Sequence, residues 1–531
     1  MALAALCSRF KKEENALLDV TAFVVDHKLR PGSTTEANGV VQQLQNLGIP
    51  AHRLDLEWPQ GVNPLELPNL ETEARRLRFR ALGLACSQRK IRSLLLAHHR
   101  DDQAETVLTR LVAGRTSIGL QGIRPVADIP ECYGIYGVYQ SGRFRFLREC
   151  HLPREEYQSP KAPSPGFETG GVRVMRPLLR FGKDRLSATC AHWNVPWVED
   201  ETNSDRTLTV RNAVRHIFQS HRLPAALTKE SISALSNRIA ADVATYQEAA
   251  DKLFGECQVE VNIRSGTVAV RFPDLASELK IHSKGSTIAA MLVRRAAELV
   301  TPEPEVSLQQ LQIPVHQIFP DLFEDDCSSG AANKLYRRFT AAGVMFSRQD
   351  RSKEGHAAGE WWLLSRQIPS RDLLIPFTEI NRFLPLKEQP FQLFDGRFWI
   401  RVRNPSKRRL TVRLSRREEL SKFIKSLDYT AATRLSGVLQ KVAPGGIRYT
   451  LPMLVVENAD NSTEPMALPT LGFKLGGSQA DGEWADLAWD VRYRKVYLPR
   501  PPKVDGIEGN ESVMTSLLGP GHTEQHHIQH L

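Results

Sequence analysis

The first 114 residues alternate between short apolar runs and amphipathic segments of helical length. Apolar and β-branched residues make up 18–25 apart from Asp19, and a second, mostly apolar run covers 91–97. Residues 33–48 and 101–114 have the spacing of amphipathic helices, and each ends at a glycine. Parallel strands need a crossover connection, usually a helix. The alternation therefore predicts an α/β fold whose parallel sheet is covered on both faces.

The rest of the chain divides by composition. The α/β pattern is expected to run over 1–216, with a proline- and glycine-rich insertion at about 124–172 that contains a hairpin around Ser141-Gly142. Residues 217–330 are expected to form a helical linker domain, with a long amphipathic helix along 232–253 and a hairpin around Ser265-Gly266. Residues 331–500 are expected to form a strand-rich, basic C-terminal region. The tail, 501–531, is polar and expected to be flexible. Its four histidines are more typical of such an end than of a metal site.

Composition excludes several classes of protein. No apolar run approaches the ~20 residues that span a bilayer, so no membrane insertion is expected. A net charge of +10 permits an anionic partner such as RNA. The seven cysteines are scattered and never form C-x-x-C, which argues against a disulfide scaffold, a zinc ribbon or an iron–sulfur site.

Titratable side chains are concentrated directly after the apolar run at 91–97. His98, His99, Asp101, Asp102 and Glu105 lie where a strand is expected to pass into a helix. Ligands of parallel sheets bind at this carboxyl edge. Asp101 or Asp102 could simply cap the helix, and Ser33 or Thr34 could cap the earlier one, but capping needs only one of the acids. The surplus predicts a site, either for a metal ion or for an ammonium group.

Five segments, in order, resemble the tRNA(Ile)-lysidine synthetases, members of the PP-loop ATP pyrophosphatase superfamily. They are VDHKLRPGS, ETEARRLRF, LLLAHHRDDQAETVLTRLVAG with GLQGI, RPLLRFGKDRL and WVEDETNSDRTLTVRN. The resemblance covers most of 1–216 and implies a nucleotide-binding PP-loop domain. It also implies a reaction in which ATP, with Mg²⁺, adenylates a cytidine of tRNA(Ile) and free lysine then displaces AMP.

The resemblance also assigns roles to residues. It implies a catalytic, lysine-side group of His99, Asp102 and Glu105. It implies ATP contacts from Asp26, His27, Arg75 and Arg78, and it assigns no metal ligand. Lys28 stands where the family usually has glycine. Two structural alternatives stay open. Asp26 and His27 could be an ordinary polar turn, and Arg75 and Arg78 could form a surface ion-pair ladder with Glu71.

Two basic segments are candidates for tRNA binding. Arg211 and Arg215 lie one helical turn apart in the last family segment and could clamp phosphates. Alternatively they could pair with acids of the same segment, which also contains Glu199, Asp200, Asn203 and Asn212. Residues 397–417 hold nine basic residues and no acid, with Trp399 interleaved, and Arg408, Arg409 and Arg413 are the predicted contacts. The alternative is a solvated strand edge.

The chain begins abruptly. Residues 1–18 resemble a helix already under way, and the family's SGGxDS loop, which would precede it, is not in the sequence. We therefore expect that the loop lies upstream of Met1. We also expect that the chain as given is poorly soluble and inactive in lysidine formation.

Other functions and the compartment stay open on sequence alone. A non-catalytic tRNA-binding relative is one alternative function. A sulfur-inserting PP-loop enzyme is the other, although such enzymes usually carry paired cysteines. A mitochondrial or cytoplasmic location is expected, without a targeting segment in the sequence.

Overall fold

The computed structural model describes most of the chain and divides it into two compact units. The described residues are 1–13, 19–115, 117–146, 166–198, 210–274, 284–323, 336–349, 360–369, 384–458, 462–475 and 484–494. The first unit contains 1–145, 168–245 and 390–393, and the second contains 146–167, 246–389 and 394–531.

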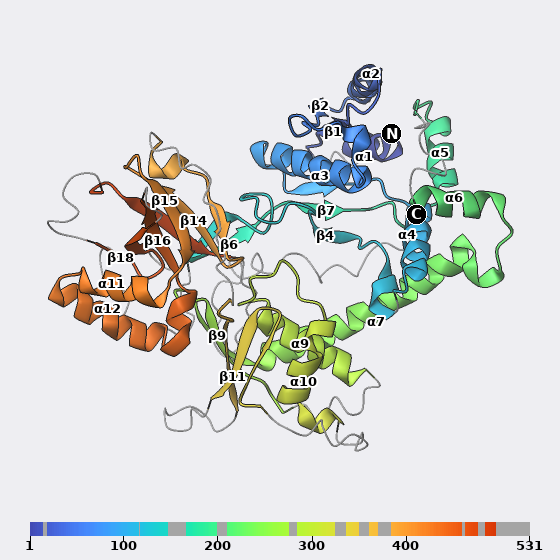
Figure 1. Cartoon of the computed structure of the whole chain (residues 1–531). Coiled ribbons are helices and arrows are strands. Elements are labelled where there is room, and N and C mark those ends of the chain that lie inside the picture. The colour runs from blue at the N-terminus through green and yellow to red at the C-terminus, as the bar shows by residue number, and fades with distance from the viewer. Residues whose placement is uncertain are drawn as a thin grey trace. The chain divides into compact units, whose positions relative to one another are not determined.

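The first unit has the predicted α/β order. Its elements begin with α1 (Ala2–Glu13), β1 (Ala22–Asp26), α2 (Ser33–Asn46), β2 (Ala51–Asp55), α3 (Leu70–Gln88), β3 (Ser93–Leu95) and α4 (Arg100–Val112). They continue with β4 (Val126–Asp128), β7 (Arg173–Met175), α5 (Lys183–His192), α6 (Val210–Ser220) and the start of α7 (Lys229–Glu256). β1 pairs with β2 and β3 with β7, both in parallel. The parallel α/β fold is therefore confirmed (Figure 1).

Three buried clusters lie among the described residues of this unit, and the smallest consists of Ala5 of α1 with Cys190 and Val195. In the first of the other two, Phe79, Leu82 and Cys86 of α3 pack against Leu94 of β3 and Val174 of β7. The second cluster joins three helices, and its members are Ala104, Val107 and Leu108 of α4, Val214 of α6, and Ile232 of α7. The apolar stripes of these helices explain the packing, because each stripe faces the other helices. The second cluster fixes α4 against α6 and α7.

The insertion differs from its prediction. β4 lies within 124–172 but pairs antiparallel with β7, so it belongs to the α/β sheet. No hairpin forms around Ser141-Gly142, because residues 131–141 run through turns in which Gly134, Gly137 and Gln140 have positive φ. Instead β5 (Gly142–Phe146) is hydrogen-bonded to β6 (Gly166–Gly170).

The second unit contains a five-stranded antiparallel sheet that crosses a predicted domain boundary. Its strands are β8 (Gln258–Asn262), β9 (Thr267–Arg271), β10 (Arg338–Ala341), β11 (Val344–Gln349) and β12 (Trp361–Arg366), in the order β10-β11-β12-β9-β8. The predicted hairpin around Ser265-Gly266 is β8–β9. Because β9 pairs with β12, the hairpin shares one sheet with residues that were expected to belong to the C-terminal region. The helices α9 (Gly285–Ala297) and α10 (Gln312–Ile318) belong to the same unit.

The remaining strands lie towards the C-terminus of the chain, and they belong to the second unit except for Gln392 and Leu393 of β13, which belong to the first. They are β13 (Gln392–Phe394), β14 (Phe398–Arg403), β15 (Arg409–Leu414), β16 (Pro452–Glu457), β17 (Thr463–Leu468), β18 (Phe473–Lys474) and β19 (Ala488–Tyr493). α11 (Arg417–Lys425) and α12 (Tyr429–Val442) bury Phe423 and Leu435 against this part of the chain, together with Met453 and Val455 of β16. The strand-rich C-terminal region is therefore confirmed.

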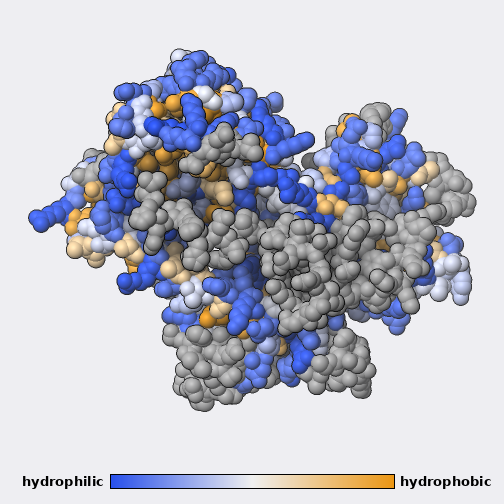
Figure 2. Space-filling model, turned by 180° about the vertical axis from the view of Figure 1, so that it is seen from behind, coloured by the Kyte–Doolittle hydropathy of each residue, from blue (hydrophilic) through white to orange (hydrophobic). Residues whose placement is uncertain are grey.

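Short 3₁₀ turns occur in both halves of the sequence. They are η1 (Pro64–Glu66), η2 (Ser117–Gln121), η5 (Ala225–Leu227), η6 (Gln309–Leu311), η7 (Pro320–Phe323), η9 (Leu386–Glu388) and η10 (Gly445–Thr450). Within the described ranges, no helix combines the length and the hydropathy needed to cross a bilayer. Among the residues that Figure 2 colours by hydropathy, most on this face are hydrophilic, and hydrophobic side chains lie in patches between them.

Candidate functional site

The start of α4 lies at the carboxyl end of β3, as the sequence predicts. β3 ends at Leu95, and α4 begins at Arg100 with His99 as its N-cap residue. The Asp102 Oδ2 atom accepts a hydrogen bond of 2.9 Å from the backbone N–H of His99. Asp102 thus stabilises the helix start, which is the structural role foreseen for one of the two aspartates.

Asp101 links α4 to two other helices. Its Oδ1 atom accepts from Lys229 Nζ of α7 at 2.6 Å, and its Oδ2 atom accepts from the backbone N–H of Lys183 of α5 at 2.9 Å. The His99 ring beside it, aided by these two donors, holds the pKa of the Asp101 carboxyl far below its usual range. Asp101 is therefore a permanent anion that fastens α5 and α7 to the start of α4.

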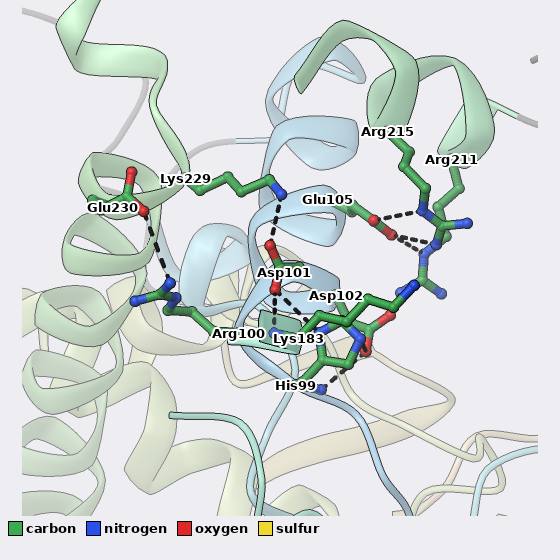
Figure 3. A network of polar contacts seen from close by, with 10 residues as sticks. All are labelled: His99, Arg100, Asp101, Asp102, Glu105, Lys183, Arg211, Arg215, Lys229 and Glu230. Carbon is green, nitrogen blue, oxygen red and sulfur yellow. Dashed lines mark hydrogen bonds and ion pairs between the residues drawn. The ribbon is translucent and has the colours of Figure 1, made fainter. Parts of the chain in front are cut away.

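Glu105 and Asp102 bind the two arginines of α6, as Figure 3 shows. Glu105 is 3% exposed, and its oxygens accept from Arg211 Nε at 2.8 Å and from Arg215 Nε at 2.8 Å. The Asp102 Oδ1 atom accepts from Arg211 Nη2 at 2.6 Å. The hydrogen bond to Glu105 raises the pKa of Arg215. The result is a charge cluster in which every carboxylate has a cationic partner.

The predicted catalytic group and two predicted tRNA contacts are therefore neighbours. His99, Asp102 and Glu105 lie together, and they lie against Arg211 and Arg215. Glu199 and Asp200, the alternative partners from the same segment, fall outside the described residues, and so does Asn203. No sequence signal indicated the tie from Asp101 to Lys229, because Lys229 opens a helix 128 residues away and belongs to no motif.

A second group of cations surrounds His98. Burial lowers the pKa of His98 to about 4; the Asp102 carboxylate opposes this shift, and the positive charges of Arg176, Arg211 and Arg78 add to it. Within the described ranges, the buried Nδ1 atom of His98 and the buried Nε atom of Arg176 lack hydrogen-bond partners. Like-charged groups repel one another, so this group would be stabilised by an anion.

Arg75 and Arg78 do not form the ladder with Glu71 that the alternative interpretation requires. Arg75 Nε lies 3.3 Å from an oxygen of Glu131, and its guanidinium lies 4.7 Å from the Phe79 ring centre. Arg78 also faces the Phe79 ring, at 5.4 Å, and makes no hydrogen bond to the part of the chain that the structure describes. Burial lowers the pKa of Arg78, the charges of Arg75 and Arg211 lower it further, and the charge of Glu71 partly opposes them. Glu71 is therefore near enough to act on Arg78, but the two form no ion pair among the described residues.

Asp26 organises the first family segment. Its oxygens accept from the hydroxyls of Ser33 at 2.8 Å and Thr34 at 2.6 Å, and from the Lys28 N–H at 3.0 Å. Burial alone would raise the pKa of Asp26, but these hydrogen bonds outweigh burial and lower it. The predicted cap by Ser33 or Thr34 is wrong, because both hydroxyls donate to Asp26 and the N-cap residue is Gly32.

The turn after Asp26 contains a strained position. Lys28 has a φ of 53°, in the left-handed region that favours glycine. Its Nζ atom lies 2.9 Å from an oxygen of Asp55, and Trp58 Nε1 donates to the carbonyl of His27 at 2.9 Å. The lysine thus adopts the backbone shape for which the resemblance implies glycine.

Basic side chains of the stretch 397–417 form ion pairs with acidic side chains from other parts of the chain. Arg408 pairs with Glu464 at 2.9 Å, and Arg409 pairs with Glu457 at 3.3 Å. Arg413 is 7% exposed and pairs with Glu419.

The case for RNA contact in this stretch is therefore partly wrong. Trp399 is 2% exposed, so it cannot stack on a base. The argument that these cations lack acidic partners fails, because the acids come from other strands and from α11. For Arg413 the reason for RNA contact no longer holds, since its side chain is buried. Contacts by Arg408 and Arg409 stay a prediction.

Comparisons with known proteins agree with these motifs. The family model described as "PP-loop domain" matches residues 1–221. A probable tRNA(Ile)-lysidine synthase of Schizosaccharomyces pombe is 27% identical over 478 residues, which is 88% of this chain and 89% of that protein. A tRNA(Ile)-lysidine synthase of Methylobacterium nodulans is 33% identical over 235 residues, which is 44% of this chain and 56% of that protein. The bacterial similarity thus covers about half of that relative's length, and the yeast similarity covers most of both chains.

Proposed function

The chain belongs to the tRNA(Ile)-lysidine synthase family through its PP-loop domain, and we propose that it shares the activity for which its relatives are named. It would use ATP to adenylate a cytidine of tRNA(Ile) and would then join lysine to that base. The observation that carries the proposal is the charge cluster on α4, at the carboxyl edge of β3. His99 Nε2 lies 3.4 Å from Asp102 Oδ2, and Arg211 joins Asp102 to Glu105, which supports the lysine-side role that the resemblance implies for these residues.

The first step needs a place for the nucleotide. The cytidine oxygen attacks the α-phosphorus of ATP, and the bond to the pyrophosphate breaks. The cations around His98 suit the anions of this step, because Arg78 and the Nε atom of Arg176 have no acceptor among the described residues. We assign these arginines to the phosphates of ATP or of the adenylate. Asp26 would act by shaping its turn, since its oxygens are already engaged by Ser33 and Thr34.

The second step needs a carboxylate that can receive the lysine ammonium. Asp102 is the best candidate, because its Oδ1 atom is held by one nitrogen of Arg211, at 2.6 Å. If the ammonium displaces Arg211 there, Arg211 still keeps its 2.8 Å bond to Glu105. Deprotonation of the ammonium by Asp102 or His99 would free the amine to attack the cytidine ring carbon, and AMP would leave. Glu105, bound by two arginines, would be a positioning residue.

The described residues do not fit a dedicated Mg²⁺ site. No group of three or more His, Cys, Asp or Glu side chains within them is arranged to hold a metal ion. The oxygens of Asp26 are engaged by hydroxyls, and those of Asp101, Asp102 and Glu105 by cations. We therefore route no step through a protein-bound metal, and propose that Mg²⁺ enters as the counter-ion of ATP.

The test measures both products. The gene's whole reading frame, with any codons that precede Met1, is expressed and incubated with tRNA(Ile), lysine and ATP. We expect AMP release that depends on lysine and tRNA, and lysidine in the nucleosides of the digested tRNA. Asp102→Asn should raise the KM for lysine about tenfold, the cost of one charge-assisted hydrogen bond, and change the KM for ATP less. Glu13→Gln, on the exposed face of α1, is the matched control.

Two outcomes would overturn parts of the proposal. tRNA binding without lysidine or AMP would favour a non-catalytic tRNA-binding protein. If the KM for lysine and the KM for ATP changed equally in a folded Asp102→Asn variant, Asp102 would not be part of the lysine site.

A further inference from the structure

A pair of arginines lies at the opposite end of β3 from the catalytic edge. Arg92 directly precedes β3, whereas His98 and His99 follow it. The Arg92 carbonyl accepts a hydrogen bond of 2.8 Å from the Arg173 N–H, which fixes its backbone at this edge of the sheet. Arg143 lies in β5 of the insertion. The charged groups of the pair thus lie outside the site described above.

The two side chains meet over a glycine. Gly170 has a φ of +96°, and a Cβ atom built there would lie 3.1 Å from Arg92 Nη1 and 3.4 Å from Arg143 Cγ. A side chain at this position would be strained and would press on both arginines. Gly170 therefore leaves the space that the Arg92 guanidinium occupies beside the stem of Arg143.

The acids of this region are bound by other groups. Asp128 accepts from Arg173 Nη1 at 3.0 Å and from Gln140 Nε2 at 2.6 Å. Glu168 is fully buried and accepts from the Tyr136 hydroxyl at 3.0 Å and from the Gly142 N–H at 2.7 Å.

Within the described ranges, Arg92 and Arg143 have no such compensation. Neither guanidinium has an acceptor or an ion-pair partner among the described residues. Partial burial and the charge of Arg143 lower the pKa of Arg92, and no carboxylate of the described residues counteracts them. Arg143 is exposed, so the pair can be reached from solvent. Two neighbouring cations without a counter-charge are stabilised by an anion with several oxygens, and guanidinium groups match phosphate geometry.

We propose that Arg92 and Arg143 together bind a backbone phosphate of the substrate tRNA, outside the anticodon loop. The inference rests on the proposed function in one respect only, that the substrate is a tRNA. It gives the insertion between β4 and β7 a role in holding RNA. A phosphate contact of this kind positions the RNA without reading its sequence.

The test compares two RNAs and three variants. Binding of whole tRNA(Ile) and of a short hairpin with its anticodon loop is measured across a salt titration. The double variant Arg92→Gln/Arg143→Gln should bind whole tRNA about tenfold more weakly, because one charge-assisted interaction is removed. Its log–log salt dependence should fall by about one unit. Its affinity for the hairpin should equal that of the unchanged protein.

Two further variants separate shape from charge. Arg9→Gln/Lys11→Gln removes the same number of charges from the exposed end of α1 and should leave tRNA binding unchanged. Arg92→Lys/Arg143→Lys should keep the salt dependence but lose part of the affinity, since lysine cannot bind a phosphate with two nitrogens.

Binding is measured without catalysis, so this test is independent of lysidine formation. Whole-tRNA affinity equal to that of the α1 variant would overturn the inference. An equal loss of affinity for the hairpin and for whole tRNA would do the same, because it would place the interaction at the anticodon. A melting curve of each variant confirms that the fold is intact.

Discussion

Replacing Glu105 by glutamine tests the buried centre of the charge cluster. The side chain keeps its shape but loses the charge that two arginines share. The Glu105 side chain is 4% exposed, while those of Arg211 and Arg215 are 35% and 25% exposed. Breaking a fully buried pair costs about 3–5 kcal/mol, and an exposed pair contributes about 0–1 kcal/mol. Because water can partly solvate the released arginines, we expect a loss of about 2 kcal/mol.

The assay should report on the stability of α4 and α6 themselves, because a chain of two units need not unfold in one step. Hydrogen exchange of peptides from α4 and α6 reports their local opening. A loss of about 2 kcal/mol corresponds to an exchange that is about 30-fold faster. Glu13→Gln, which breaks the exposed pair with Arg9, should change the exchange of α1 less than about threefold. If Glu105→Gln had an effect as small as that control, Glu105 would not hold α6 to α4.

Three further predictions concern packing, pH and RNA. Gly83→Ala should lower the melting temperature of the first unit, because the new Cβ atom would lie 2.6 Å from Val138 Cγ1. Such overpacking costs about 1–3 kcal/mol of folding free energy. An unchanged melting curve would show that the space around Gly83 is not tightly packed. The folded-state pKa of Asp26 is lowered from 3.8, so its contribution to stability is present above that value and is lost as pH falls through the folded pKa. Asp26→Asn should therefore be less stable at neutral pH and lose less stability on acidification, as urea midpoints against pH would show. Arg408→Ser/Arg409→Ser should weaken tRNA binding and lower the log–log slope of its salt dependence by about one unit for each phosphate that is no longer bound. An unchanged salt titration would mean that the two arginines bind only Glu464 and Glu457 and no RNA.

Local patterns in the sequence predicted most elements correctly. The helical spacing at 101–114 and 232–253 became α4 and α7, and the alternation around Ser265-Gly266 became β8–β9. These signals are local, because a stripe or an alternation is complete within one element. The failed hairpin at Ser141-Gly142 shows the limit. Its apparent strand contains three positive φ positions, and β5 pairs across the insertion instead.

Side-chain partners far apart in sequence could not be predicted. The motif placed acids at the start of α4, but nothing in it indicates that Glu105 binds arginines 106 and 110 residues later. The stretch 397–417 misled for the same reason, since its acids lie on other elements. The N-cap of α2 could not be predicted from its own sequence, because the hydroxyls of Ser33 and Thr34 donate to Asp26, which lies seven and eight residues earlier.

The separation between α4 and its partners also affects synthesis of the protein. A ribosome adds about 5–20 residues per second, so the 110 residues between Glu105 and Arg215 take about 5–20 s to appear. Lys229, which binds Asp101, appears later still. During that interval the nascent α4 presents three adjacent carboxylates without their cationic partners, together with the apolar stripe that later meets α6 and α7. Until α6 and α7 have been translated, chaperones and proteases can therefore reach this part of the PP-loop domain.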